Sequence, residues 1–263
     1  MKPIEELKGV LDKVAAGLAR AQRVLFITGA GISADSGLPT YRGIGGLYNG
    51  KTTADGMRIE EALSGEVFRR RPDITWKYLA QIESNCRQAG PNPAHHAIAQ
   101  LERHLPGVVV LTQNVDGLHR KAGSRNVIEI HGNLQRLACT HCDYEEEAES
   151  LEHHAIPPIC PRCGHVLRPR VVLFGENLPP AAVERFFAVL DEGFDMVFSI
   201  GTSSNFPYIV EPVLWASQSG ITTVEINPGQ TVLSEVVEHR LPLGAAAAMT
   251  ALLERLGQPS KPA

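Results

Sequence analysis

The chain has 263 residues, which is enough for one large domain or two modest ones, and its 43% hydrophobic and 21% charged residues are ordinary for a globular protein. A formal net charge of −4 argues against binding to nucleic acid or to a membrane surface. Apolar runs stay well short of the roughly 18 residues of a membrane-spanning helix, and the acidic N-terminal turns are unlike a secretory signal, so we predict a cytoplasmic protein.

Helices and strands alternate along most of the chain. An amphipathic helix opens it, with apolar side chains at helical spacing at Ile4, Leu7, Leu11, Val14 and Leu18. Continuous apolar runs, typical of strands buried on both faces, follow at 24–28, 108–112, 126–130, 195–200 and 222–226. Helical stretches at 93–104, 180–192 and 207–219 precede three of these runs. This alternation predicts an α/β fold with a doubly wound, parallel, Rossmann-like sheet.

Two segments interrupt the alternation. Residues 38–88 carry helical patterns without a clear strand, and residues 133–169 carry two cysteine pairs, an acidic run and several prolines. We expect these two segments to join into a smaller module. The larger domain is then discontinuous and consists of 1–37, 89–132 and 170–257, and a disordered tail follows at 258–263.

A glycine-rich stretch follows the first predicted strand. Gly29-Ala30-Gly31-Ile32-Ser33-Ala34 fits the pattern G-x-G-x-x-(G/A), in which glycines let a pyrophosphate approach the backbone and a helix N-terminus. The motif alone leaves a tight turn without ligand equally open. A dehydrogenase would also carry an acidic residue about 20 positions on, at the end of a second strand. Here that region reads RGIGGLYNGKTT, so we predict a nucleotide site outside the standard dehydrogenase arrangement.

Polar or small residues follow the other four predicted strands. They are Gln113, Asn114 and Asp116 after the second strand, His131 after the third, Gly201, Thr202 and Ser203 after the fourth, and Asn227 after the fifth. Ligands of open α/β sheets bind beyond the carboxyl ends of the strands. Loops are generally polar, but these residues together predict a binding site at that edge.

Three of these residues have side chains suited to chemistry. His131 titrates near neutrality and can take a proton from a hydroxyl, or it merely caps its strand. Asp116 can orient a sugar or a charged ring, or it forms the turn in VDG. Asn114 can bind a water or a carboxamide, or its side chain caps the turn.

Four of the five cysteines form two close pairs. Cys139 and Cys142 are separated by 17 residues from Cys160 and Cys163, the spacing of a four-thiolate zinc ribbon. Four protein ligands leave no open coordination position, so we predict one structural Zn²⁺ that holds the smaller module together. Iron in the same geometry is the lesser alternative. Cys86 stands alone and is predicted to have no role.

These motifs, in this order, resemble one family, the sirtuins, which are NAD-dependent protein lysine deacylases. The resemblance covers about residues 20–255 and includes GAGISADSGLPTYR, TQNVDGLH, EIHGN, the cysteine pairs, LFGE, GTS and EIN. It implies a reaction in which the acyl oxygen attacks the ribose carbon of NAD as nicotinamide leaves. A general base then deprotonates a ribose hydroxyl that attacks the acyl carbon, giving free lysine, nicotinamide and O-acyl-ADP-ribose.

The resemblance also implies roles for matching positions. His131 is similar to the general base, so activity should fall as it becomes protonated below a pKa of about 6.5. Gly29 opens the loop in which Ala30, Gly31 and Ile32 resemble the phosphate cradle, and Tyr41 and Arg42 resemble a pair that closes over NAD, with Tyr41 where the family usually has Phe. Asn114, Asp116 and Gln113 are similar to residues around the nicotinamide and its ribose, and Gly201, Thr202, Ser203 and Asn227 are similar to contacts of the adenosine half.

The segment Val171–Glu176 resembles the edge that pairs with the substrate backbone by strand addition. Val171, Val172, Phe174 and Gly175 would then contact substrate, with Phe174 beside the acyl-lysine. After GTS the family commonly reads V-x-P-A, whereas this chain has the bulkier Asn205-Phe206-Pro207-Tyr208.

Relatives that prefer acidic acyl groups carry a Tyr-x-x-Arg pair in a helix after a tryptophan. Counted from Trp76, the matching positions are Leu79 and Ile82, and a register shifted by one gives Tyr78 and Gln81. Neither register supplies an arginine for the distal carboxylate, so we predict acetyl or longer uncharged acyl groups on protein lysines.

Two other functions stay open at this point. A mono-ADP-ribosyltransferase would use the same NAD site with another acceptor. A zinc ribbon that binds nucleic acid beside an inert α/β domain is the other, but the acidic run EEEAE and the net charge argue against it. The sequence carries no signal of oligomerisation, so a monomer is the default expectation.

Overall fold

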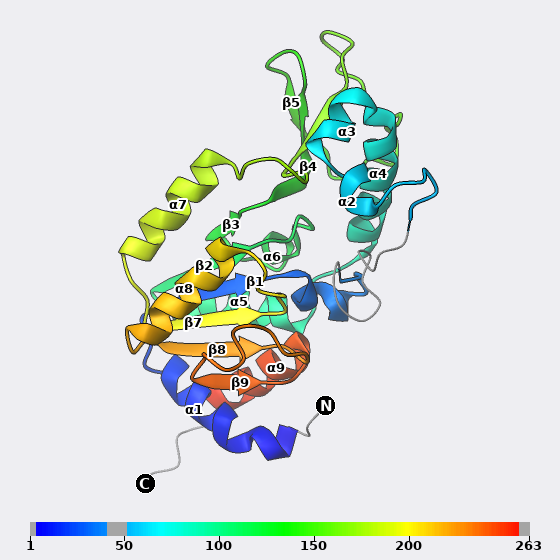
Figure 1. Ribbon diagram of the computed structural model, residues 1–263. Coiled ribbons are helices and arrows are strands. Elements are labelled where there is room, and N and C mark those ends of the chain that lie inside the picture. The colour runs from blue at the N-terminus through cyan, green and yellow to red at the C-terminus, as the bar shows by residue number, and fades with distance from the viewer. Residues whose placement is uncertain (1–3, 41–51, 258–263) are drawn as a thin grey trace.

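The computed structural model describes residues 4–40 and 52–257 and has two lobes (Figure 1). The predicted NAD contacts Tyr41 and Arg42 and the predicted tail 258–263 lie outside the described residues. Among the described helices, none is long and apolar enough to cross a membrane.

Six parallel strands form the sheet of the larger lobe. In spatial order they are β3 (Val127–Glu129), β2 (Gly107–Thr112), β1 (Arg23–Thr28), β7 (Met196–Ile200), β8 (Thr222–Ile226) and β9 (His239–Leu241). The chain moves outward from β1 in one direction and then returns to place β7 on its other side, as in a Rossmann fold. The predicted fold class is therefore confirmed, and β9 is a short strand that the sequence patterns did not indicate.

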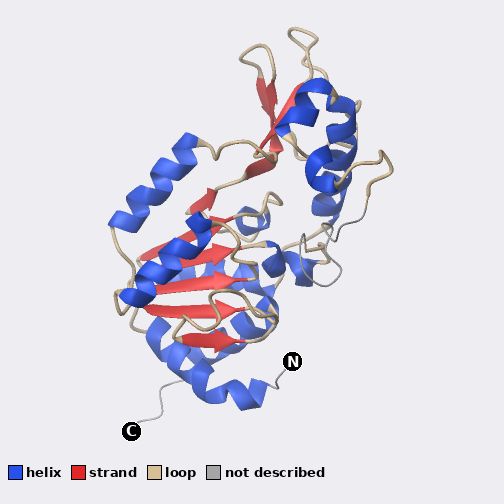
Figure 2. Ribbon diagram, viewed as in Figure 1, coloured by secondary structure: helices blue, strands red, loops and turns tan. Residues whose placement is uncertain are grey.

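Helices cover both faces of this sheet (Figure 2). One face packs against α1 (Lys8–Leu18), α5 (Pro93–His104) and α9 (Ala245–Leu256), and the other against α7 (Pro180–Asp191) and α8 (Pro207–Gln218). The run VLFIT is apolar throughout because its side chains alternate between these layers. Val24 and Phe26 enter the first core, whereas Leu25 and Ile27 enter the second.

The smaller lobe combines the two segments that interrupt the alternation. Its helices are α2 (Ile59–Ala62), α3 (Gly65–Arg70) and α4 (Pro72–Gln88), and its antiparallel sheet has the order β5 (Glu145–Glu147), β4 (Gly132–Cys139), β6 (Leu167–Val171). Trp76 of α4 is fully buried and donates its indole N–H to the Leu167 carbonyl at 2.8 Å. This contact joins the helical segment to the sheet of the ribbon.

Gly132 is the point at which the chain leaves the large sheet for the small one. Its φ of +82° lies in the left-handed region, and a Cβ there would lie 1.8 Å from the Arg170 carbonyl oxygen. Only glycine fits this close approach of β4 and β6. The turn fixes His131, the preceding residue, at the junction of the lobes.

Candidate active site between the lobes

A cavity of about 720 Å³ lies between the carboxyl edge of the large sheet and the smaller lobe. Loops that follow β1, β2, β3, β7 and β8 line one side, and α4 with residues 171–178 lines the other. The structure brings together at this cavity the following predicted residues: Gly29, Ala30, Gly31, Leu79, Ile82, Gln113, Asn114, His131, Val171, Val172, Phe174, Gly175, Gly201, Thr202, Ser203 and Asn227.

The glycine loop packs directly against the loop that follows β7. The Gly31 N–H donates to the Gly201 carbonyl at 2.7 Å, and a Cβ on Gly31 would lie 2.6 Å from the Gly201 Cα. The loop continues as a 3₁₀ helix, η2 (Ala30–Ser36), where the motif predicted the start of an ordinary helix. The side chain of Ile32 points into the core, so only its backbone is available to a ligand.

His131 is held at both ring nitrogens. Nδ1 lies 3.0 Å from the Gln113 carbonyl oxygen, and Nε2 lies 2.7 Å from the Tyr208 hydroxyl. A carbonyl oxygen can only accept, so Nδ1 carries the proton and Nε2 carries the lone pair. Burial lowers the pKa of His131, and the hydrogen bond to Gln113 opposes that shift only in part. The imidazole is therefore a neutral base at the cavity wall.

Asp116 lies behind this cavity, in a smaller adjoining pocket that Ala30, Asn114 and Cys86 also line. Its carboxylate accepts from the Ser33 hydroxyl at 2.7 Å and from the Leu118 N–H at 2.9 Å. Burial raises the pKa of Asp116, and these two donors counteract the effect. Cys86, predicted to have no role, thus lies at the wall of the pocket that holds Asp116.

Asn114 connects the glycine loop to Asp116. Its Nδ2 lies 3.1 Å from the Gly29 carbonyl oxygen and 3.2 Å from the Ser33 hydroxyl, which itself donates to Asp116. Asn114 and Asp116 are therefore part of one buried hydrogen-bond network. A ligand that enters the smaller pocket would meet polar groups whose positions this network fixes.

A second network ties together the loops after β2, β7 and β8. Gln113 Nε2 donates to the Thr202 hydroxyl at 2.9 Å, and Asn227 Nδ2 donates to the Thr202 carbonyl at 2.9 Å. The buried carboxylate of Glu225 accepts from Thr231 and from Ser234, the latter at 2.6 Å, and so fixes the loop beside the cavity. Glu225 was not among the predicted site residues, although a lone acid inside the apolar run TTVEI is a signal of a special role.

The four paired cysteines converge on one point in the smaller lobe, and none of them lines the cavity. All four Sγ atoms lie within 4.8 Å of one another, with 3.4 Å between Cys139 and Cys163 and 3.7 Å between Cys142 and Cys160. Tetrahedral Zn²⁺ with Zn–S bonds near 2.3 Å needs S···S separations of about 3.8 Å. Two backbone N–H groups also point at the Cys139 sulfur, as suits a thiolate. The cluster fits one structural zinc.

Comparison with known proteins agrees with this geometry. The sequence model of the Sir2 family matches residues 29–207. The NAD-dependent protein deacylase 2 of Pseudomonas aeruginosa is 54% identical over 231 residues, which cover 87% of this chain and 90% of that protein. The chain belongs to the Sir2 family.

More distant Sir2 relatives match most of the chain. The NAD-dependent protein deacylase of Pyrococcus abyssi is 40% identical and aligns over 88% of this chain and 92% of its own. A solved Sir2 homologue in complex with NAD superposes with a TM-score of 0.83 at 36% identity, covering 93% of each chain. A Sir2 complex with a p53 peptide and NAD⁺ gives 0.79 at 28% identity, covering 93% of this chain and 98% of that one.

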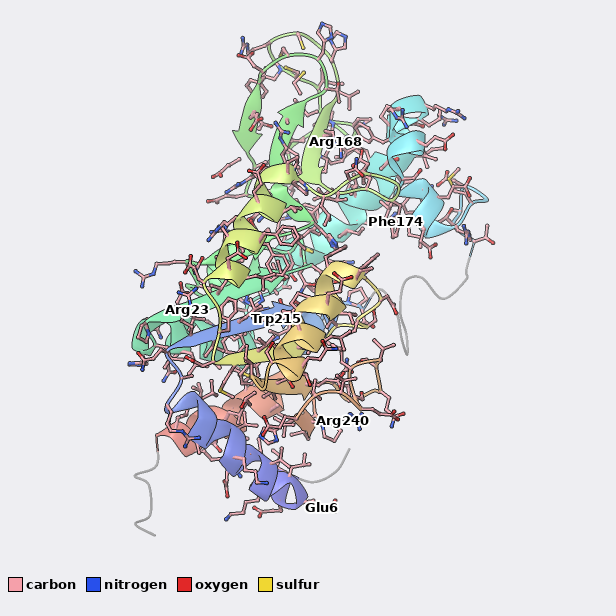
Figure 3. All side chains as sticks on the ribbon, turned by 60° about the vertical axis from the view of Figure 1, so that its left-hand side comes forward. Glu6, Arg23, Arg168, Phe174, Trp215 and Arg240 are labelled. Atoms are coloured by element: carbon pink, nitrogen blue, oxygen red, sulfur yellow. The ribbon has the colours of Figure 1, made fainter. Side chains whose placement is uncertain are left out.

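In this Sir2 chain the segment after β6 is fixed from two directions. The Val172 N–H donates to the His131 carbonyl at 2.9 Å, and the Phe174 N–H donates to the Leu63 carbonyl at 3.0 Å. Arg168 and Glu176 form a bidentate pair at 2.9 Å, and Arg168 also donates to the Val171 carbonyl at 2.9 Å. Figure 3 shows Arg168 on the small lobe and Phe174 near the junction of the lobes.

The α4 side of the cavity is apolar. Leu79 and Ile82 line it, whereas the Tyr78 hydroxyl donates away from it to Asp55. Among the described lining residues, Glu176 is the only one with a fixed charge, and Arg168 neutralises it. Of the two registers considered in the sequence, the one counted directly from Trp76 therefore gives the residues that line the cavity, Leu79 and Ile82.

Proposed function

We propose that this Sir2 protein removes uncharged acyl groups from protein lysines with NAD as co-substrate, giving nicotinamide and O-acyl-ADP-ribose. The observation that carries this function is His131, a neutral base that lines a cavity between a glycine loop and a fixed apolar edge. The Pseudomonas aeruginosa relative is itself named an NAD-dependent protein deacylase.

Each part of the site has a task in this reaction. NAD supplies the ribose carbon that receives the acyl oxygen when nicotinamide leaves, and the loops at Gly29–Gly31, Gly201–Ser203 and Asn227 would hold its phosphates and adenosine. Asn114 and Asp116 would present polar groups to the nicotinamide ribose, and His131 would take up the proton that a ribose hydroxyl loses. The edge at Val171–Gly175 would hold the peptide by backbone hydrogen bonds, with Phe174 beside the acyl-lysine.

The reaction is tested by its products. An acetyl-lysine peptide incubated with NAD and enzyme should give deacetylated peptide, nicotinamide and O-acetyl-ADP-ribose in equal amounts by mass spectrometry. An unchanged peptide together with ADP-ribose attached to protein would identify a transferase instead.

The apolar α4 wall predicts the acyl preference. A succinyl group would place an unpaired carboxylate between Leu79 and Ile82, so kcat/KM should be higher on the acetyl peptide than on its succinyl twin. Ile82→Arg should raise the succinyl-to-acetyl ratio of kcat/KM by about tenfold or more, because a charge-assisted pair contributes roughly 1.5–3 kcal/mol. Ile82→Met, which adds length without charge, should leave that ratio unchanged. A wild-type enzyme faster on succinyl-lysine would contradict this pocket assignment.

The lowered pKa of His131 predicts the acid limb of the pH profile. Burial disfavours the imidazolium, so the neutral base persists to more acidic pH than its ordinary pKa of 6.5 would allow. With chemistry rate-limiting, the acid limb of kcat for deacylation should have an apparent pKa below 6.5. Exchange of labelled nicotinamide into NAD reports on the step before His131 acts. The exchange rate should therefore not fall with the same apparent pKa. An acid limb at 6.5 or above would show that His131 is more solvated than its contacts indicate.

The protein's location and assembly belong to the same proposal. Four reduced thiolates around zinc suit the cytoplasm, where thiols stay reduced. Acylated lysines on proteins are the expected partners, and a monomer is sufficient because one chain supplies the whole described cavity.

A further inference from the structure

The hydroxyl of Tyr208 is hydrogen-bonded to Nε2 of His131, the atom whose lone pair the proposed reaction needs. Its oxygen lies 2.7 Å from Nε2 of His131, while Nδ1 is already committed to the Gln113 carbonyl. Because Nδ1 holds the only ring proton of the neutral imidazole, Nε2 must accept, and Tyr208 must donate. The base of this enzyme is therefore reached through a second side chain.

Tyr208 is firmly placed by its surroundings. It lies in the first turn of α8, and its ring stacks on Phe206 with centroids 5.3 Å apart and planes at 13°. Both rings meet the imidazole edge-on at 6.0 Å. The two stacked rings thus lie together against the imidazole of His131, and both line the cavity.

The hydroxyl is suited to passing a proton rather than losing one. Burial raises the pKa of Tyr208 to about 12, so it remains a neutral phenol at neutral pH. A phenol oxygen that donates to Nε2 still has lone pairs with which it can accept from another hydroxyl. A ribose hydroxyl in the cavity can therefore bond to Tyr208 without displacing it.

We propose that Tyr208 is a catalytic residue that carries the proton of the ribose hydroxyl to His131. This step rests on the proposed deacylase function. The ribose hydroxyl gives its proton to the Tyr208 oxygen as the tyrosine's own proton moves to Nε2. Attack of the acyl oxygen on the ribose carbon has by then turned the amide into a carbon–nitrogen double bond. The ribose oxygen uses its released electron pair to bond to the acyl carbon, and the π electron pair of that double bond moves onto the lysine nitrogen. Tyr208 ends neutral, and His131 ends as the imidazolium.

The first test needs no NAD. In ¹⁵N-histidine-labelled protein, the Nε2 resonance of His131 is assigned by its loss in His131→Gln. Its chemical shift in the wild type should be that of an imidazole nitrogen that accepts a hydrogen bond. Tyr208→Phe keeps the stacked ring and removes only the hydroxyl, so it should move that resonance toward a non-bonded nitrogen. Tyr144→Phe, a matched change in the ribbon where the hydroxyl bonds Glu146, should not move it. An unchanged Nε2 resonance in Tyr208→Phe would overturn the proposed contact.

The second test separates the proton relay from the earlier step. Tyr208→Phe should lower kcat for deacylation by roughly 10²-fold, the lower range for a lost proton-transfer group, while nicotinamide exchange stays at the wild-type rate. Equal or faster deacylation in Tyr208→Phe would overturn the relay and mean that NAD displaces the tyrosine. If wild-type enzyme gives neither deacylation nor exchange, the deacylase function fails and the resonance test still reports on the Tyr208 contact.

Discussion

Replacing His131 with alanine is expected to remove net deacylation almost completely while nicotinamide exchange continues. In the proposed mechanism the Nε2 lone pair of His131 receives the proton of the ribose hydroxyl through Tyr208, and its loss should lower kcat by about 10²–10⁴-fold. In that mechanism the departure of nicotinamide comes earlier, and the substitution leaves in place the hydrogen bonds of Asn114 and Asp116, which we propose to lie beside the nicotinamide ribose. Both rates are measured in one preparation, from O-acetyl-ADP-ribose formation and from labelled nicotinamide entering NAD.

His96→Ala is the matched control for this substitution. His96 is exposed on α5 and lies outside the cavity, so its loss should leave both rates unchanged. If His131→Ala deacylated at more than a tenth of the wild-type rate, another group would have to be the base. Loss of exchange together with deacylation would instead point to a collapsed NAD site.

Removal of zinc is expected to unfold the smaller lobe and abolish activity. A structural Zn²⁺ contributes on the order of 10 kcal/mol or more to the folding of a small ribbon, more than this three-stranded sheet could replace. The lobe is tied to catalysis because β4 begins directly after His131 and β6 ends at Val171, where the proposed substrate edge starts. Chelation, or Cys160→Ser, should lower the Tm by roughly 10 °C or more and eliminate deacylation.

The metal content provides the check on that result. Wild-type protein should hold one zinc per chain by elemental analysis, and so should Cys86→Ser, since Cys86 lies outside the cluster. Restoring zinc to the chelated wild type should restore both Tm and activity. A metal-free protein with unchanged Tm and activity would show that the cluster does not stabilise the lobe.

Much of the site could be read from the sequence because it depends on short-range patterns. Two C-x2-C turns are enough to bring four sulfurs together, and the cluster has the spacing that zinc requires. The residues after successive parallel strands must meet at one edge of the sheet, and Gln113, His131, Thr202 and Asn227 do so. The apolar run VLFIT likewise predicted a strand with two buried faces.

The tertiary structure alone decided which side chains touch across those loops. Tyr208 follows β7 and His131 follows β3, and two other strands separate these in the sheet, so no local pattern could pair them. The same holds for Cys86 at the pocket of Asp116. The sequence by itself determined which residues follow the strands at the carboxyl edge of the sheet and which cysteines pair as zinc ligands, since periodicity and spacing are encoded within a few residues. The hydroxyl partner of His131 depended on how distant loops pack, which is fixed only when the whole sheet and its two layers of helices have formed.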